Sequence, residues 1–165
     1  MVILNNMEMI VACDEMDGIG YKNKLLYDIK RDMQWFVENT RNTSVIMGRN
    51  TWESLPVKPL KNRTNIVISS SEVEGADFTF GCIQDIVDYV AGNPDKRFVV
   101  IGGESIYKQL EPYTSKLYLT RVHSVSMSDT SFHVDLTRWD LTWSEKYINT
   151  NGGPHCTFMI FNKLI

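Results

Sequence analysis

The sequence has few cysteines and no long apolar run, the features that mark secreted, metal-binding or membrane-embedded proteins. Its 165 residues contain only three cysteines, Cys13, Cys82 and Cys156, at wide spacings and without a C-x-x-C pair. That pattern argues against a disulfide framework or a zinc site, and we expect no metal. No run approaches the ~20 apolar residues of a membrane span. Asn5 and Glu8 interrupt the apolar start, which makes it a poor signal peptide.

Basic excess is also missing. The formal net charge is −3, which argues against a general nucleic-acid binder, although a few local cations can still hold a small anion. With 43% hydrophobic and 22% charged residues, the composition is that of an ordinary globular protein. We therefore expect one soluble, cytoplasmic domain over residues 1–165, monomeric by default, without nucleic-acid or membrane partners.

Strand-like runs alternate with helical patterns along the chain. The expected strands are Met7–Cys13, Ser44–Gly48, Asn65–Ser69, Arg97–Gly102, Lys116–His123, Trp143–Thr150 and His155–Asn162. The expected helices are Ile29–Asn39, capped by Asp28, then Arg49–Leu55, Ile83–Ala91 and Glu104–Leu110. This alternation predicts a single α/β domain, with a central, mostly parallel twisted sheet and helices on both faces. The Asn151–Pro154 turn predicts an antiparallel C-terminal hairpin.

Asp32 occupies a position where the helical pattern favours a hydrophobe. Ile29, Met33, Phe36 and Val37 have the i, i+4, i+7, i+8 spacing of a core-facing stripe, and Asp32 fills its i+3 position. A buried carboxylate needs partners or becomes neutral. Asp32 is therefore either a polar residue at the edge of the stripe or a pocket carboxyl that anchors a ligand with N–H donors.

Two strand-to-helix junctions suit a phosphate-bearing ligand. Gly102 and Gly103 precede the helix at Glu104, where backbone can approach a ligand closely, although a simple tight turn would use the same glycines. At the other junction, Gly48 leads into Arg49, Asn50 and Thr51, which form either an anion grip or an ordinary helix start with a solvated arginine. Together the two junctions favour a dinucleotide. Ser69 and Ser70 could add hydroxyls, or mark a loop.

The segment Asp14–Tyr27 follows the first expected strand and contains Gly18 and Gly20. Its length and glycine content fit a mobile lid, and equally fit a plain connecting loop.

Three blocks carry a resemblance to a known family. VIMGRNTWESL (45–55), IGGESIY (101–107) and KLYLTRV (116–122) are similar in sequence, order and spacing to blocks of the dihydrofolate reductase family. The resemblance runs from about Met9 to the C-terminus and leaves residues 1–6 as a short leader. It implies reduction of 7,8-dihydrofolate to tetrahydrofolate with NADPH, in one-carbon and thymidylate metabolism, and binding of antifolate inhibitors.

The resemblance also implies residue roles. Asp32 would bind the pterin and promote protonation at N5, Thr120 would support its carboxyl group, and Tyr27 would close the lid near the reacting atoms. The substrate-binding residues would be Ile10, Val11, Asp32, Met33, Phe36, Leu55, Leu60, Arg63, Ile101, Tyr107 and Thr120, with Arg63 pairing the glutamate carboxylate. The cofactor-binding residues would be Ala12, Ile19, Gly20, Gly48, Arg49, Asn50, Thr51, Ser69, Ser70, Ile101, Gly102, Gly103, Glu104, Ser105, Ile106 and Tyr107. The resemblance further implies a cis Gly102–Gly103 bond and a contact between Asp129 and the lid.

The chain departs from the family pattern at several positions. Leu26 and Tyr27 stand where the lid commonly ends in Pro and Trp, and Lys30 replaces a helix-entry Pro. Glu104 and Ser105 replace a Gly and a frequent Arg. The cation lost at Ser105 often helps to hold the 2′-phosphate, so a narrower preference for NADPH over NADH is expected.

Three other functions remain open at this point. A related reductase of riboflavin synthesis has a similar fold, but Asp32 and Arg63 favour folate. A non-catalytic nucleotide-binding or scaffold protein would bind NADPH without turnover. A phosphate-binding signalling domain gives no reason for Asp32.

Overall fold

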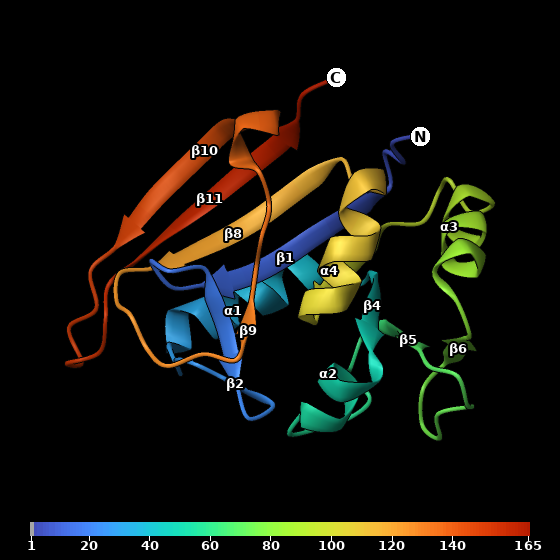
Figure 1. Cartoon of the computed structure of the whole chain (residues 1–165), viewed down its shortest axis with the longest axis horizontal. Coiled ribbons are helices and arrows are strands. Elements are labelled where there is room, and N and C mark those ends of the chain that lie inside the picture. The colour runs from blue at the N-terminus through green and yellow to red at the C-terminus, as the bar shows by residue number, and fades with distance from the viewer. Residues whose placement is uncertain (1) are drawn as a thin grey trace.

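The protein is built on one eight-stranded sheet. A computed structural model describes residues 2–165. The strands in spatial order are β10 (Trp139–Tyr147), β11 (Cys156–Lys163), β8 (Lys116–Val122), β1 (Met7–Cys13), β7 (Phe98–Gly102), β4 (Ser44–Gly48), β5 (Thr64–Ile68) and β6 (Phe78–Phe80). From β8 to β6 all neighbours are parallel, whereas β11 is antiparallel to both β8 and β10. This arrangement, visible in Figure 1, confirms the predicted fold class.

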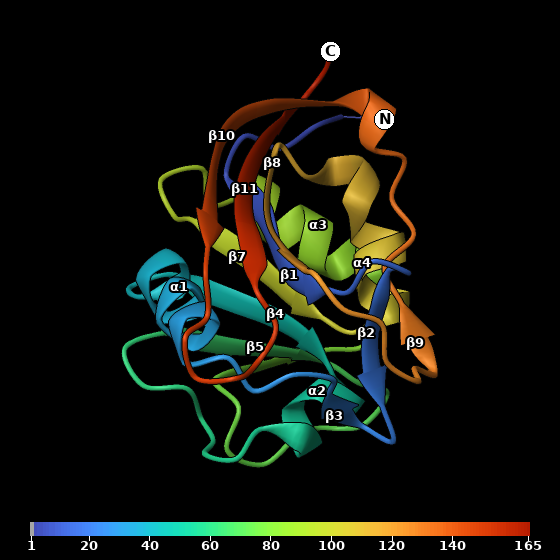
Figure 2. The same ribbon diagram turned by 90° about the vertical axis from the view of Figure 1, so that its left-hand side faces the viewer.

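Helices cover both faces of the sheet. They are α1 (Lys30–Thr40), α2 (Arg49–Ser54), α3 (Ile83–Ala91) and α4 (Glu104–Leu110), with 3₁₀ turns η1 (Glu111–Tyr113) and η2 (Leu136–Arg138). Alternate residues of a strand point to opposite faces. Phe98 and Val100 of β7 therefore pack with α3 and α4, while Val99 packs with Trp35 of α1. Figures 1 and 2 show α1 and the α3–α4 pair on opposite sides.

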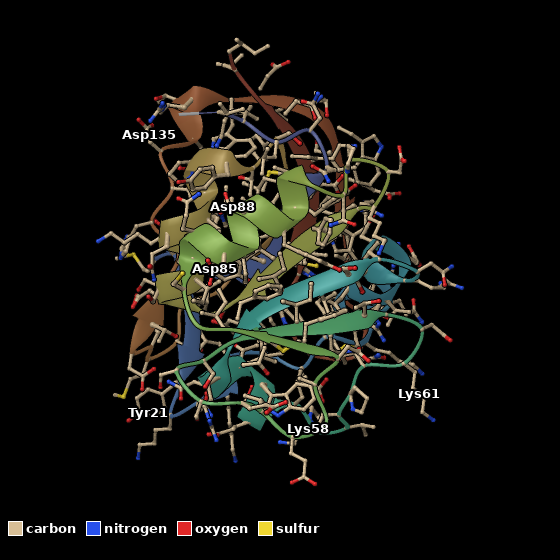
Figure 3. All side chains as sticks on the ribbon, turned by 90° about the vertical axis from the view of Figure 1, so that its right-hand side faces the viewer. Tyr21, Lys58, Lys61, Asp85, Asp88 and Asp135 are labelled. Atoms are coloured by element: carbon tan, nitrogen blue, oxygen red, sulfur yellow. The ribbon has the colours of Figure 1, made fainter. Side chains whose placement is uncertain are left out.

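Helix α3 shows how a clear periodicity fixes an element. Ile86, Val87 and Val90 are buried against the sheet. Asp85 and Asp88 lie on the exposed side, which faces the viewer in Figure 3. The bounds predicted for this helix are those observed.

Helix α1 departs from its predicted form. Its N-cap is Ile29 and no side chain caps the first turn, so the predicted Asp28 cap is wrong. The predicted apolar stripe is only partly right: Ile29 is buried and Phe36 packs against the core, but Met33 is 48% exposed and Val37 37% exposed. Trp35 is buried instead, stacking on Trp143 and packing on Phe158. A tryptophan buries more apolar surface than Met or Val, and its burial sets the rotation of the helix.

The segment between β1 and α1 contains strands that the sequence did not reveal. A second sheet joins β3 (Lys24–Leu25), β2 (Gly18–Tyr21) and β9 (Thr130–Ser131) in that order. We call it the lid sheet. The segment is therefore more than a plain loop. Strand β10 also begins at Trp139, four residues before its predicted start. None of the helices in residues 2–165 is long and apolar enough to cross a membrane.

Candidate active site

A cleft of about 740 Å³ opens at the carboxyl ends of the parallel strands. Open α/β sheets bind ligands at this edge. Of the predicted cofactor residues, the cleft brings together Ala12, Ile19, Gly20, Gly48, Arg49, Asn50, Thr51, Ile101, Gly102, Gly103, Glu104, Ser105, Ile106 and Tyr107. The sequence reasoning missed Asn23, Lys24, Leu25, Ser54, Ile68 and Thr130, which also line it, and gave Asp129 only a lid contact. Lys24, Leu25 and Thr130 belong to the lid sheet, whose short strands carry no periodic signal.

The glycine pair forms one wall of the cleft. The Gly102–Gly103 peptide is cis and Gly102 has φ +130°, a conformation that favours glycine. A Cβ at Gly102 would lie 3.3 Å from the Tyr107 hydroxyl and 3.4 Å from Thr51 Oγ1. The wall therefore presents bare backbone to a ligand. Tyr107 is itself fixed, since its hydroxyl donates to the Ile10 carbonyl at 2.7 Å.

Arg49, the first residue of α2, lines the cleft at an exposed rim. Its Nε contacts Glu53 Oε1 at 3.0 Å, and its Nη1 contacts Ser69 Oγ at 3.3 Å and Ser71 Oγ at 3.0 Å. The guanidinium is exposed and held in place by these groups. The second hydroxyl at this rim comes from Ser71 rather than from the predicted Ser70.

Asp32, on α1, is partly buried and faces Thr120 of β8. Thr120 Oγ1 donates to Asp32 Oδ1 at 2.6 Å. Burial raises the pKa of the Asp32 carboxyl above its ordinary value, and the Thr120 hydrogen bond and the Arg31 charge oppose that rise only in part. The structure shows a carboxyl that is hydrogen-bonded by a side chain and has a raised pKa, as the ligand-anchoring interpretation requires.

Apolar side chains pack on the face of the sheet on which Asp32 meets Thr120. Ile10 is buried in the same cluster as Trp35, with Tyr27, Phe36 and Ile101 partly buried beside it. The Tyr27 hydroxyl is buried and has no hydrogen-bond partner among residues 2–165. Met33 is half exposed one residue beyond Asp32, free to contact a ligand. This part of the molecule thus combines one acid with apolar side chains, the composition typical of small-ligand sites.

The remaining predicted substrate residues lie further along the same face. Leu55 and Leu60 are partly buried against Val45, Met47 and Trp52. Arg63 Nη1 donates to Thr40 Oγ1 at 3.0 Å, and its guanidinium lies 5.9 Å from the Phe36 ring centroid. Arg63 is thus held next to a predicted pterin-side residue. Val11, Ile101 and Tyr107 line the main cleft as well, so they join the two regions.

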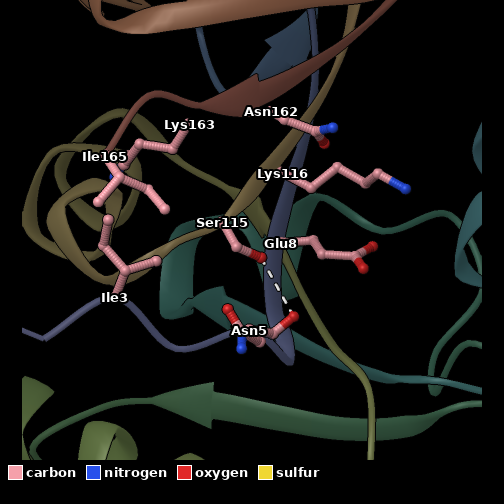
Figure 4. Close-up of a pocket in the computed structure, with 8 residues that line it drawn as sticks. All are labelled: Ile3, Asn5, Glu8, Ser115, Lys116, Asn162, Lys163 and Ile165. Atoms are coloured by element: carbon pink, nitrogen blue, oxygen red, sulfur yellow. Dashed lines mark hydrogen bonds between the residues drawn. The ribbon is translucent and has the colours of Figure 1, made fainter.

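A second hollow, of about 570 Å³, lies where β1 and β8 begin and is lined by Glu8, Ser115, Lys116 and Lys163 among others (Figure 4). Its charges are largely paired internally: Glu8 with Arg97 at 2.7 Å and Lys163 with Glu111 at 3.3 Å. None of the predicted site residues lines it.

A cleft fit for a dinucleotide, together with a hydrogen-bonded and partly buried acid on α1, indicates an α/β oxidoreductase that works with a nucleotide. Known proteins give the particular family. The family model for dihydrofolate reductase matches residues 6–163. Dihydrofolate reductase of Buchnera aphidicola subsp. Acyrthosiphon pisum is 38% identical, over 77% of this chain and 78% of that protein. That of Bacillus subtilis is 35% identical over 93% and 92%. The chain belongs to the dihydrofolate reductase family.

The solved structures agree. Dihydrofolate reductase from Enterococcus faecalis, complexed with NADP(H) and RAB-propyl, superimposes with a TM-score of 0.86 and 26% identity, covering 99% of each chain. The family match decides against the riboflavin-pathway reductase, the scaffold and the signalling domain.

Proposed function

We propose that this enzyme reduces 7,8-dihydrofolate to 5,6,7,8-tetrahydrofolate with NADPH, and that Asp32 is the group on which turnover depends. The partly buried Asp32 carboxyl, hydrogen-bonded by Thr120, is the observation that carries the proposal. Family membership supports the reaction, and the pocket supports the assignment of residues.

The cleft fits NADPH. Bare backbone at Gly102 and Gly103, with Thr51 beside it, suits a pyrophosphate, and Arg49 with the Ser69 hydroxyl suits the 2′-phosphate at the exposed rim. NADPH, when bound, supplies the hydride that reduces the C6–N5 bond of the substrate. The protein's own contribution is position and electrostatics.

Asp32 binds the 2-amino group and N3 of the pterin. Because burial keeps its proton affinity high, the Asp32 carboxyl favours protonation at N5 by water admitted past the lid. Thr120 fixes the orientation of the carboxyl group. Tyr27 closes this end of the pocket, where its unpartnered hydroxyl is available to a bound water or ligand. An antifolate inhibitor with N–H donors would occupy the same pocket.

The test follows nicotinamide absorbance with purified protein, NADPH and dihydrofolate. Asp32→Asn should bind NADPH normally but lose at least about 10²-fold in kcat at neutral pH, the usual contribution of a positioned acid or base. The wild-type hydride-transfer rate should fall as pH rises through the pKa of Asp32. The rate of the Asp32→Asn variant should not show this pH dependence. Asp85→Asn, the same change on the solvent side of α3, serves as the control. Full activity of Asp32→Asn would refute the assigned role.

A further inference from the structure

Strand β9 is held from two sides. On one side, the Asp129 amide donates to Gly20 O at 2.9 Å and the Phe132 amide donates to Asp17 O at 2.8 Å, which joins β9 to the lid segment. The amide of Ser131 points the other way and donates to Glu104 Oε2 at 2.9 Å. Edge strands present such outward amides, and here a carboxylate takes one up.

Glu104 is the first residue of α4 and directly follows the glycine pair. It lines the cofactor cleft, as do Gly20 and Thr130 of the lid sheet. An anionic side chain here repels the phosphates of a dinucleotide. The Glu104 carboxylate therefore weakens the binding of a dinucleotide. What it offers in return, and an apolar residue would not, is a hydrogen-bond acceptor for the Ser131 amide.

We propose that Glu104 is a positioning residue that fastens the lid sheet to the glycine turn, so that lid position and cofactor binding depend on each other. The inference rests on the proposed function, because it takes the cleft to be the NADPH site. A second contact supports the same connection: Phe132 packs edge-to-face on Tyr107 of α4, with ring centroids 5.2 Å apart.

Two effects of Glu104 act in opposite directions and can be separated. The acceptor oxygen holds β9, which favours a closed lid over bound cofactor. The negative charge disfavours the phosphates. Glu104→Gln keeps an acceptor without the charge, whereas Glu104→Ala removes both.

The experiment measures amide hydrogen exchange over residues 14–25 and 126–132 without cofactor, then the Kd for NADPH by fluorescence titration, and finally KM and kcat. In Glu104→Ala, exchange over the lid sheet should rise about tenfold, the effect of losing a charge-assisted hydrogen bond. Glu104→Gln should restore most of the protection and bind NADPH more tightly than the wild type. Asp95→Ala, which removes a carboxylate from the exposed turn before β7, is the matched control.

Unchanged lid exchange in Glu104→Ala would overturn the proposal. So would a rise spread evenly over the chain, since that is the mark of a merely structural residue. The exchange readout needs neither NADPH nor turnover. If the protein did not reduce dihydrofolate, the proposed role of Glu104 could therefore still be correct. If it did reduce dihydrofolate but lid exchange were the same in Glu104→Ala and the wild type, only the positioning role would be refuted.

Discussion

At the scale of single residues, Asp32 is a group that the proposed function requires but that lowers the stability of the fold at neutral pH. Its raised pKa means that the folded chain holds a proton that the unfolded chain has already lost at the same pH. Between the ordinary carboxyl pKa of about 3.9 and the raised value, increasing pH therefore lowers the free energy of unfolding. Above that window, the cost of ionising this partly buried carboxyl in the folded chain remains.

Asp32→Asn should accordingly be more stable than the wild type at neutral pH. The amide oxygen still accepts from Thr120, and no charge is buried. The gain should shrink as pH falls and level off below about 4, where the wild-type carboxyl becomes protonated in both states. Urea unfolding at several pH values checks this, and a stability difference that did not vary with pH would contradict it.

The sequence located Asp32 for a reason that was only partly right. Its place on the inner side of α1 follows from a stripe of Ile29, Met33, Phe36 and Val37, of which Met33 and Val37 are exposed. Asp32 lies on the inner side because it precedes the buried Trp35 by three residues, which is one helical turn. Periodicity alone could not choose between these stripes, since the decisive contacts come from Trp143 and Phe158, more than a hundred residues away.

At the scale of elements, the lid segment depends on one buried acid. Asp14 is fully buried; its Oδ1 accepts the amides of Met16 and Gly18 at 2.9 Å each, and its Oδ2 accepts the Ser126 amide at 3.1 Å. One carboxylate thus ties the start of the lid segment to the loop that leads into β9. No sequence pattern marked Asp14, because three amides from two separate segments converge on it only after folding.

Asp14→Asn should therefore destabilise the protein by about 1–3 kcal/mol and speed exchange in residues 14–20 and 124–128, because the new NH₂ group faces an amide donor. Asp17→Asn is the matched control: Asp17 forms a half-exposed ion pair with Arg121 at 2.7 Å, and Asn tolerates its φ of 62°. That variant should lose less than about 1 kcal/mol. Equal losses of stability in the two variants would show that Asp14 contributes no more to the lid segment than an exposed ion pair does.

Elements with a strong local signal were predictable, and those made by long-range pairing were not. The bounds of β1, β4, α3 and α4 came out as observed, because apolar runs and breakers such as Gly92 and Pro112 define them within the chain. The lid sheet was missed because β3 and β9 are only two residues long. Such strands exist only through pairing with β2, and pairing is invisible to periodicity.

At the scale of the whole molecule, the hydrophobic clusters share the same strands. Phe98 and Val100 of β7 belong to the cluster under α3 and α4, while Val99 between them belongs to the cluster under α1. Ile101 packs against both the α1 cluster and the cluster around Trp52 of α2. Unfolding of the residues in one cluster would expose apolar side chains of the neighbouring cluster to water. No part of the sheet can therefore unfold by itself at low cost in free energy.

We therefore expect one cooperative unfolding transition. Far-ultraviolet circular dichroism and tryptophan fluorescence should give the same midpoint, and the midpoint should not vary with protein concentration if the chain is a monomer. NADPH at 100 times its Kd should raise the free energy of unfolding by about 2.7 kcal/mol while leaving a single transition. The glycine wall and the Arg49 rim come from β7, α4 and α2, and all of these must be folded for the cleft to exist. Two unfolding transitions, of which NADPH shifts only one, would mean that the part of the protein that forms the cleft unfolds as a separate unit.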